Sequence, residues 1–412
     1  MKPKLLAPVG NFVALKVALD SGADEVYFGV KGLNMRAGAQ NFVISDIKKI
    51  INLCHQNNCR AFLAINTIVY DNEIKKVELI LKKAKKYGID AIIAWDMSVI
   101  NIALKLGLEI HLSTQASVSN FESISFYKNF IPNLKRVVLA RECTLSQIKN
   151  IIQKIRKNKL DIEIEVFIHG AMCVSISGRC FMSQELFGKS ANRGECIQPC
   201  RREYEAFLKD PEEGKELSLG KDYVMSPKDL CAMPFIEKLI DSGITCFKVE
   251  GRNRNPEYVN NVISSYRKII DYYVLNKNKI STSKNANIIF QKMKKELVSN
   301  MINVYNKGFS DGFFLGKPVN EWSKEYGSKG KEYKLFVGKV VNYYPKKKVA
   351  EVKIDSYSPE NNKDIIILGK TTGLIRQKIR NIKGEINKGG IITFIVNSKV
   401  RKNDDVYKIM TR

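Results

Sequence analysis

The sequence predicts an α/β fold: a (β/α)8 TIM-like barrel, followed by a helical connector and a small C-terminal β-barrel. Short apolar runs recur at intervals of roughly 25–35 residues up to about residue 250, and helix-like stretches fill the intervals. Eight such repeats in about 250 residues are typical of a closed barrel of parallel strands. After about residue 334 the pattern changes to short β-like runs separated by turn signals. The chain has 412 residues, enough for two or three domains.

The eight predicted barrel strands are KLLAPV, EVYFGV, RAFLAIN, AIIAWD, EIHLST, RVVLAR, IEIEVFIHG and CFKVEG. Two of the stretches between them, NFVALKVALDSG and LSQIKNIIQKIRKN, have helical spacing and end in Gly or Asn, as helix stops do. An open, doubly wound sheet is the structural alternative. No G-x-G-x-x-G follows the first strand, which argues against the dinucleotide-binding form of that alternative.

The predicted domains are residues 1–275 for the barrel with its cysteine cluster, 276–333 for the helical connector and 334–412 for the small basic β-barrel. A long helical region begins at Pro256, a natural first-turn position, and residues 276–288 are predicted to be an exposed loop. Residues 331–412 carry a net charge of +11, from 19 Lys/Arg against 8 Asp/Glu. Small basic β-barrels often bind nucleic acid, although many serve only as packing modules.

The whole chain has a formal charge of +26. This charge indicates either a polyanionic partner such as nucleic acid or a lysine-rich composition whose lysines cover solvated helix faces, as in IKKVELILKKAKKYG. No run of 18 uncharged apolar residues is present, so no membrane-spanning helix is expected. The start, MKPKLLAPVGNF, lacks the apolar region of a signal peptide, and the expected location is therefore cytoplasmic.

Four of the nine cysteines lie within the stretch FIHGAMCVSISGRCFMSQELFGKSANRGECIQPC. They are Cys173, Cys180, Cys196 and Cys200, with the spacing C-x6-C-x15-C-x3-C. The predicted strand before them ends near Gly170, which places the cluster at the C-terminal face, where barrel active sites are built. In a reducing cytoplasm, clustered thiols more often bind metal or perform redox chemistry than form disulfides.

Thiolates are ligands for both zinc and iron–sulfur clusters. Structural zinc sites usually show paired C-x2-C knuckles, which are absent here. A cubane cluster needs only one thiolate at each corner iron, so the irregular spacing favours iron–sulfur over zinc. Buried cysteines without metal are the third interpretation, but SISGRC and ANRGEC are polar for a core. Cys231, in PKDLCAMPF, is a further candidate that could replace Cys200 as a ligand.

Polar residues follow the predicted strands, at the mouth where they are expected to surround one site. We predict catalytic roles for His111, Gln115, Glu165, His169 and Glu250, and substrate-binding roles for Asn34, Arg36, Asn66, Arg141 and Arg252. Arginines there could clamp a carboxylate or phosphate by two-pronged contacts, and Glu250 and His111 could move protons. For each residue an ordinary structural role, such as a helix cap, an ion pair or a buried histidine, is the alternative.

Several motifs resemble the peptidase U32 family. The signature EVFIHGAMCVSISGRCFMS is joined by LLAPVGNFVALKVALDSGADEVYFG, LNMRA, STQASVSN, NRGECIQPCR and FKVEGR. The resemblance covers nearly the whole chain. It implies an iron–sulfur protein that hydroxylates without molecular oxygen, with a [4Fe–4S] cluster on the four clustered cysteines. The branch that it most resembles makes 5-hydroxyuridine in tRNA and depends on prephenate, so tRNA and a small carboxylate co-substrate are the expected partners.

Two other activities and one binding role stay open. One relative of this family hydroxylates a cytidine in ribosomal RNA, and the family name itself implies a collagenase-like protease. The sequence contains neither H-E-x-x-H nor G-x-S-x-G, and His169 with Cys173 is the possible cysteine–histidine pair. A non-catalytic, zinc-stabilised RNA-binding protein is the remaining alternative.

Overall fold

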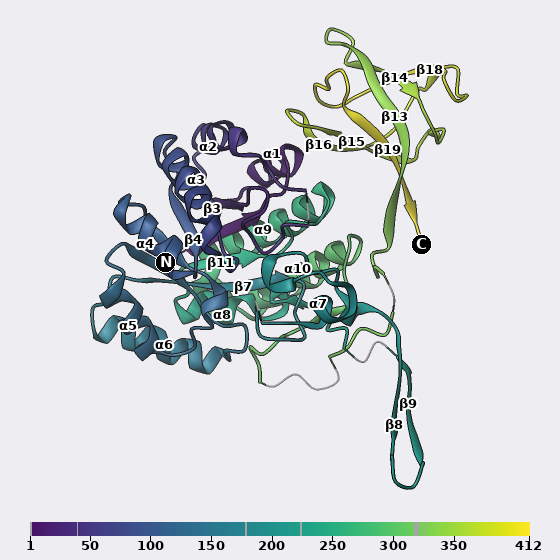
Figure 1. The fold of residues 1–412 in the computed structure, drawn as a ribbon. Helices are drawn as coiled ribbons and strands as arrows, with labels where there is room; N and C mark the ends of the chain where they lie inside the picture. The colour runs from purple at the N-terminus through teal and green to yellow at the C-terminus, as the bar shows by residue number, and fades with distance from the viewer. Residues whose placement is uncertain (1, 39, 178, 223–224, 317–320, 326) are drawn as a thin grey trace.

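The computed structural model describes residues 2–38, 40–177, 179–222, 225–316, 321–325 and 327–412. Eight parallel strands form the predicted barrel: β1 (Lys4–Pro8), β2 (Glu25–Phe28), β3 (Arg60–Ala64), β4 (Ala91–Ala94), β5 (Ile110–Leu112), β6 (Leu134–Val138), β7 (Glu163–Gly170) and β11 (Cys246–Val249). They pair in chain order, and β11 closes the circle by pairing with both β7 and β1. The predicted barrel and all eight strand positions are confirmed (Figure 1).

Helices cover the outside of the barrel in the alternating order that parallel pairing requires. They are α1 (Phe12–Asp20), α2 (Ile47–His55), α3 (Ile74–Lys86), α4 (Met97–Lys105), α5 (Phe121–Phe130), α6 (Leu145–Lys157), α8 (Ile236–Ser242) and α9 (Pro256–Thr282). Local sequence sets their starts: the Asn11 side chain accepts from Ala14 N at 2.9 Å, and Thr144 with Gln147 forms a capping box.

Two apolar layers follow from strand alternation, since successive side chains point to opposite faces. Outward-facing residues form one large core with the helices. A second, small cluster lies inside the barrel and comprises Leu6, Tyr27, Phe62, Ala64, Ala91, Ile93 and Cys246. The barrel is therefore packed through its centre rather than hollow.

One connection of the barrel is much longer than the others. Between β7 and α8 the chain forms α7 (Met182–Phe187), a two-stranded hairpin of β8 (Tyr204–Lys209) and β9 (Glu216–Asp222), and the short strand β10 (Asp229–Cys231). β10 returns antiparallel to β7 and also pairs with β12 (Phe309–Ser310). The hairpin extends away from the barrel (Figure 1). The insertion puts all four clustered cysteines above the carboxyl ends of the strands.

The exposed loop predicted over residues 276–288 is wrong. α9 continues to Thr282, and α10 (Lys284–Ile302) starts two residues later. The ring of Phe290 from α10 is buried against Tyr273, with the ring centres 5.3 Å apart. Packing between the two helices thus overrides the weak helix propensity of the Asn- and Ser-rich sequence.

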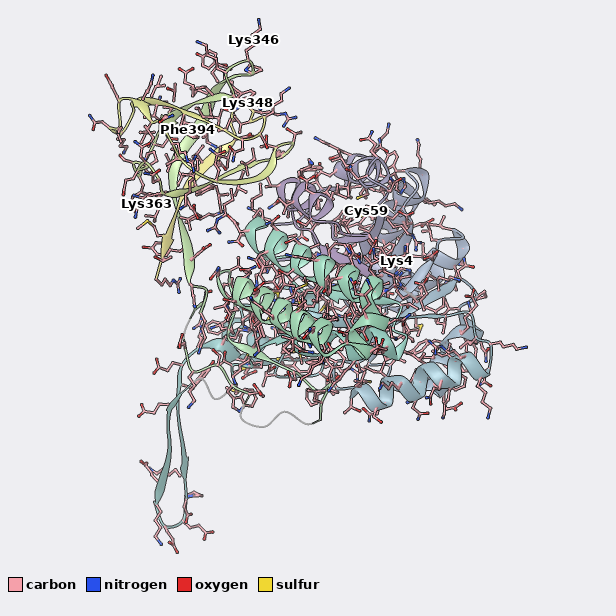
Figure 2. All side chains as sticks on the ribbon, turned by 180° about the vertical axis from the view of Figure 1, so that it is seen from behind. Lys4, Cys59, Lys346, Lys348, Lys363 and Phe394 are labelled. Carbon is pink, nitrogen blue, oxygen red and sulfur yellow. The ribbon has the colours of Figure 1, made fainter. Side chains whose placement is uncertain are left out.

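The C-terminal region is an antiparallel sheet of β13 (Glu332–Tyr344), β14 (Val349–Ile354), β15 (Asp364–Gly369), β16 (Gly373–Lys378), β17 (Lys383–Gly384), β18 (Ile391–Ile395) and β19 (Asp405–Thr411). It has its own apolar core, which includes Val352, Ile367 and Phe394. The Gln377 side chain links strands β16 and β18 by donating to Ile395 O at 2.7 Å, so the sheet curls toward closure. Lys346 and Lys348 lie on the β13–β14 turn, away from the barrel (Figure 2).

Among the described residues, no helix combines the length and apolar character needed to cross a lipid bilayer.

A buried ion network crosses the barrel interior. Arg136 on β6 donates to both carboxylate oxygens of Glu25, at 2.6 and 2.9 Å, and to Glu165 at 3.3 Å. Lys248 on β11 donates to the other oxygen of Glu165 at 2.8 Å. The Arg136 side chain is 1% exposed, so water does not share in its neutralisation. Buried charges that lose one partner destabilise a fold strongly.

We expect Arg136→Met to lower the free energy of unfolding by about 3–5 kcal/mol, because it removes the two-pronged cation of the buried Glu25 carboxylate and leaves only Arg60, 3.8 Å away. Denaturant titration followed by circular dichroism measures the change. The matched control is Lys82→Met, which breaks an exposed pair with Glu78 and should cost about 0.5 kcal/mol or less. Equal losses in the two variants would contradict the assignment.

Candidate functional site

A cavity of about 400 Å³ opens at the carboxyl ends of the barrel strands. Its floor consists of the last inward-facing side chains of five strands, together with Ser113, which directly follows β5; the strand residues are Tyr27, Ala64, Ile93, Phe167 and Lys248. The β2–α2 loop and the long insertion after β7 form its walls. All four clustered cysteines line this cavity, at the face where barrel enzymes build their active sites.

The cysteine segment is anchored to the barrel at a few points. Gly194 has φ +86°, and a side chain there would place its Cβ 2.1 Å from Asn34 O in the β2–α2 loop. Only glycine fits this close approach. Next to it, Arg193 forms an ion pair with Glu73, and Asn192 accepts from Cys180 N at 3.0 Å. These contacts hold the segment over the cavity.

The clustered thiols are free and close enough to influence one another electrostatically. Burial raises the pKa of Cys200 to about 11; Arg201 opposes this shift, and the charges of Cys173, Cys196 and Cys180 add to it. Burial also raises the pKa of Cys196, whose sulfur accepts from Gln198 N at 3.3 Å. A bound metal would favour the thiolate forms that this environment disfavours.

The donor set fits a thiolate-bound metal in residue type and in the cavity that the four sulfurs share. In the part of the chain that the structure describes, no three Cys, His, Asp or Glu side chains are already arranged in metal-ligand geometry. The residues that would hold a [4Fe–4S] cluster are Cys173, Cys180, Cys196 and Cys200. Cys231 is unsuited, since it is buried on β10 with its sulfur 3.9 Å from the Tyr266 hydroxyl, outside the cavity.

Beside the cysteines, a carboxylate is surrounded by arginines. Arg36 donates to Glu250 Oε1 from Nη2 at 2.8 Å and from Nε at 3.1 Å, and the Tyr27 hydroxyl donates to Oε2 at 3.3 Å. Burial alone would raise the pKa of Glu250, but the charges of Arg36, Arg141 and Arg252 lower it to about 2. Glu250 is therefore an ionised anchor for cations at neutral pH, rather than a proton donor.

Two of these arginines keep hydrogen-bonding capacity. The Nε and Nη1 atoms of Arg252 and the Nε atom of Arg141 are buried without a hydrogen-bond partner among the described residues. Burial lowers the pKa of Arg252 to about 10, which leaves it charged at neutral pH. Buried guanidinium N–H groups without partners are costly unless a ligand satisfies them. The arrangement can bind a carboxylate or phosphate.

A chain of amides and a hydroxyl forms another wall. Asn66 Nδ2 lies 3.3 Å from Gln115 Oε1 and 3.5 Å from Ser113 Oγ. Asn66 Oδ1 accepts from Met35 N at 3.2 Å, which ties the β2–α2 loop to the cavity. Gln115, Asn66, Arg36, Arg141, Arg252 and Glu250 thus all line the cavity, as the sequence predicted. Their catalytic or binding roles stay predictions.

Three predicted catalytic residues do not reach the cavity. His111 and Glu165 face inward but lie one layer below its floor, two residues before Ser113 and Phe167 respectively. Glu165 has a pKa of about 2, because Lys248 and Arg136 outweigh the raising effect of burial, and it serves the interior ion network. His111, which lies 2.9 Å from Glu109, packs on the ring of Phe62.

His169 lies outside the barrel altogether. The pairing of β7 with β11 shifts register between Lys248 and Val249, so His169 pairs with the outward-facing Val249. Its ring packs against Tyr258, Tyr266 and Phe309, and burial lowers its pKa to about 3. The predicted pairing of His169 with Cys173 is therefore not present.

Asn34 also lies away from the cavity lining. Its side chain donates to Val30 O at 2.6 Å and accepts from Arg36 N at 3.0 Å. It therefore positions the loop that carries Arg36, rather than contacting a substrate.

Sequence reasoning missed Tyr27, Asn192, Arg201, Lys248 and Arg254, all of which line the cavity. Tyr27 lies two residues after Glu25, and Lys248 lies two residues before Glu250. Since alternate residues of a strand point to the same face, this spacing would have predicted that both face the barrel interior. Asn192 and Arg201 lie in single-turn 3-10 helices and Arg254 lies in the loop before α9, where the strand period does not apply.

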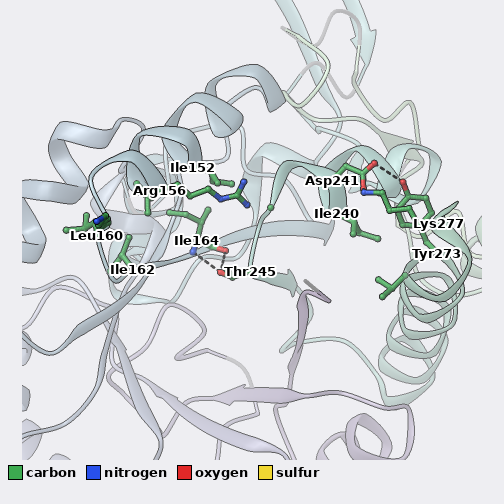
Figure 3. A pocket seen from close by; sticks show the side chains of 14 residues that line it. Ile152, Arg156, Leu160, Ile162, Ile164, Ile240, Asp241, Thr245, Tyr273 and Lys277 are labelled. Carbon is green, nitrogen blue, oxygen red and sulfur yellow. Dashed lines mark hydrogen bonds and ion pairs between the residues drawn. The ribbon is translucent and has the colours of Figure 1, made fainter. Parts of the chain in front are cut away.

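A second cavity, of about 490 Å³, lies between α6, α8 and α9 near the other ends of the strands (Figure 3). Aliphatic side chains such as Ile152, Ile162 and Ile240 line it, with Arg156 and Lys277 among its cations. Asp241 there is already engaged by the Tyr273 hydroxyl at 2.7 Å and by Lys277 at 2.6 Å. It contains no thiol and none of the predicted site residues, so the smaller cavity is the candidate site.

We expect the free energy of unfolding of the Glu250→Gln variant to depend less on pH, below about pH 4.5, than that of the wild type. The folded-state pKa of about 2 lies below the ordinary value of 4.5, so the stabilisation is present above about pH 4.5 and is lost as the pH falls toward 2. This amounts to roughly 3 kcal/mol. Urea unfolding across this pH range measures it. Glu78→Gln, which removes an exposed carboxylate, should keep almost the wild-type slope, and a wild-type slope in Glu250→Gln would contradict the assignment.

Comparison with known proteins identifies the family. The family model for peptidase family U32 matches residues 10–324. A collagenase of Porphyromonas gingivalis is 38% identical over 99% of this chain and 98% of its own length. An uncharacterized protease of Methanocaldococcus jannaschii is 39% identical over 98% of this chain and 97% of its own. The tRNA hydroxylation protein P1 of Bacillus subtilis is 35% identical over 83% of this chain and 78% of its own. The resemblance noted in the sequence is thus confirmed: the chain belongs to peptidase family U32.

Proposed function

We propose that this protein is an iron–sulfur enzyme that hydroxylates a uridine of tRNA without molecular oxygen. The observation that carries the proposal is one cavity that brings four thiols together with three arginines around the buried Glu250 carboxylate, and that no histidine lines. Similarity to a tRNA hydroxylation protein over most of the chain supports RNA as the substrate class. Hydroxylation of ribosomal RNA, the activity named for a relative in Escherichia coli, is the nearest alternative.

In this proposal Cys173, Cys180, Cys196 and Cys200 hold a [4Fe–4S] cluster, which when bound supplies redox chemistry beside the pocket. Arg141 and Arg252 bind the carboxylate of a small co-substrate, with prephenate as the candidate, through their free N–H groups. Arg36 and Glu250 fix the orientation of this pair of arginines. Asn66 and Gln115 offer amide groups to the edge of the base.

The charge distribution supports binding of a polyanion. Residues 331–412 carry 19 Lys/Arg against 8 Asp/Glu. Several of these lysines, including Lys346, Lys348 and Lys363, are exposed on the C-terminal sheet (Figure 2). Phosphate contacts made by such residues weaken steeply as salt rises. The C-terminal sheet would therefore hold the body of the tRNA while the barrel mouth receives the base.

Proteolysis is the second candidate, because relatives named collagenase and protease align over nearly the whole chain. A cysteine protease needs a base next to its thiol. The three histidines of the chain are all described: His55 pairs with Asp90 on the surface, His111 lies below the floor and His169 lies outside the barrel. None lines the cavity, so the geometry favours hydroxylation.

Anaerobically purified protein is expected to be brown, with about four iron and four sulfide per chain. Alanine substitution at any one of the four cysteines should lower iron content and visible absorption. Cys231→Ala is the matched control and should keep both. A colourless protein with one zinc would support the zinc-stabilised alternative instead, and loss of iron in Cys231→Ala would contradict the ligand set.

Deleting the gene in its native host is expected to remove 5-hydroxyuridine-derived nucleosides from tRNA, as measured by mass spectrometry of digested tRNA. The wild-type gene should restore them, whereas a Cys173→Ala or Arg252→Ala gene should not. Unchanged tRNA nucleosides in the deletion strain would exclude the tRNA assignment. A lost hydroxycytidine in ribosomal RNA would transfer the activity to that substrate.

A further inference from the structure

Five large apolar side chains of the cysteine segment are exposed. Ile176, Phe181, Leu186, Phe187 and Ile197 are all at least 39% exposed, and Phe181 is 71% exposed. We call these five residues the apolar rim. Groups of exposed apolar side chains mark surfaces that contact a partner.

The apolar rim belongs to the mouth of the cavity. Cys180 and Met182, on either side of Phe181, both line the cavity, as does Ile197. Ile197 N donates to Ser183 Oγ at 3.3 Å, which fixes Ile197 against α7. Ile197 therefore lies at the opening of the cavity, and the exposed Phe181 lies directly between two residues that line it.

The charged residues near the apolar rim indicate which kind of molecule would bind there. The cavity is lined by six cationic residues, Arg36, Arg141, Arg201, Lys248, Arg252 and Arg254, against two acidic ones, Glu195 and Glu250. At the rim itself, the exposed Arg202 guanidinium lies over the ring of Phe187, 4.4 Å from its centre. Planar apolar groups interleaved with arginines fit a ligand that offers flat bases and phosphates together.

We propose that the apolar rim, with Phe181 foremost, stacks the unpaired bases next to the nucleotide that enters the cavity. The substrate class is then an RNA loop with splayed bases rather than a duplex, because paired bases hide their faces from an aromatic side chain. This inference rests on the proposed function, since it takes RNA as the substrate. It assigns to Phe181 a positioning role that is separate from cluster binding and from the arginine site.

The test measures binding of the full-length, anaerobically purified protein to a short RNA hairpin with an unpaired, uridine-containing loop, by fluorescence anisotropy. Phe181→Ala and Phe181→Leu are both expected to raise Kd by about fivefold or more, whereas Phe181→Trp keeps it near wild type. The salt dependence of Kd should stay unchanged, because no cation is removed. The matched control is Phe126→Ala, which removes a 59%-exposed ring on α5 and should bind as wild type does.

Several outcomes would overturn the inference. If wild type binds the hairpin and Phe181→Ala binds equally well, the rim does not stack bases, although the proposed function stands. If Phe181→Leu binds as wild type does, the contact is apolar but not stacking. If wild type prefers a fully paired duplex, the substrate class is wrong. If wild type binds no RNA but binds gelatin in a Phe181-dependent way, the rim serves a polypeptide and the proposed function fails with it.

Discussion

The barrel mouth is held together by the electrostatic attraction between the Glu250 carboxylate and the arginines around it. Three arginines and a tyrosine hydroxyl converge on it from β2, the β2–α2 loop and the segments that follow β6 and β11. Without a central anion, the three guanidinium groups would repel one another, and the desolvation of the buried Arg252 would not be offset. One carboxylate cannot satisfy every N–H group of three guanidinium groups. The site is thus held together and at the same time left able to accept a further anion.

Below the cavity floor, a second group of buried ion pairs stabilises the barrel itself. Arg136, Glu25, Glu165 and Lys248 form ion pairs with one another inside the barrel, and the first three do not line the cavity. Lys248 belongs to both levels, because its side chain neutralises Glu165 and also lines the cavity floor. Depth along the strand therefore separates residues that stabilise the fold from residues that meet a substrate.

The insertion after β7 gives this barrel its particular chemistry. It brings four thiols, the apolar rim and several arginines to a mouth that the strands alone would leave open. Besides the pairing of β10 with β7, it contacts the β2–α2 loop through Gly194 and the segment that carries Glu73 through Arg193. Loops held in this way on a rigid scaffold are where barrel enzymes usually carry their function.

Local sequence patterns were enough to predict the barrel strands, the position of the four cysteines on one cavity, and the arginine and amide residues at the mouth. Each of these follows from local patterns: apolar runs, chain order, and residues just after a strand. How deep a side chain lies along its strand, and to which side of the barrel it points, depends on packing in three dimensions. Register shift in β7 turns His169 outward, and His111 and Glu165 fall one layer too low. Helix packing converts a predicted loop into α9 and α10. These outcomes depend on contacts between distant segments, and a single sequence does not encode such contacts as a local pattern.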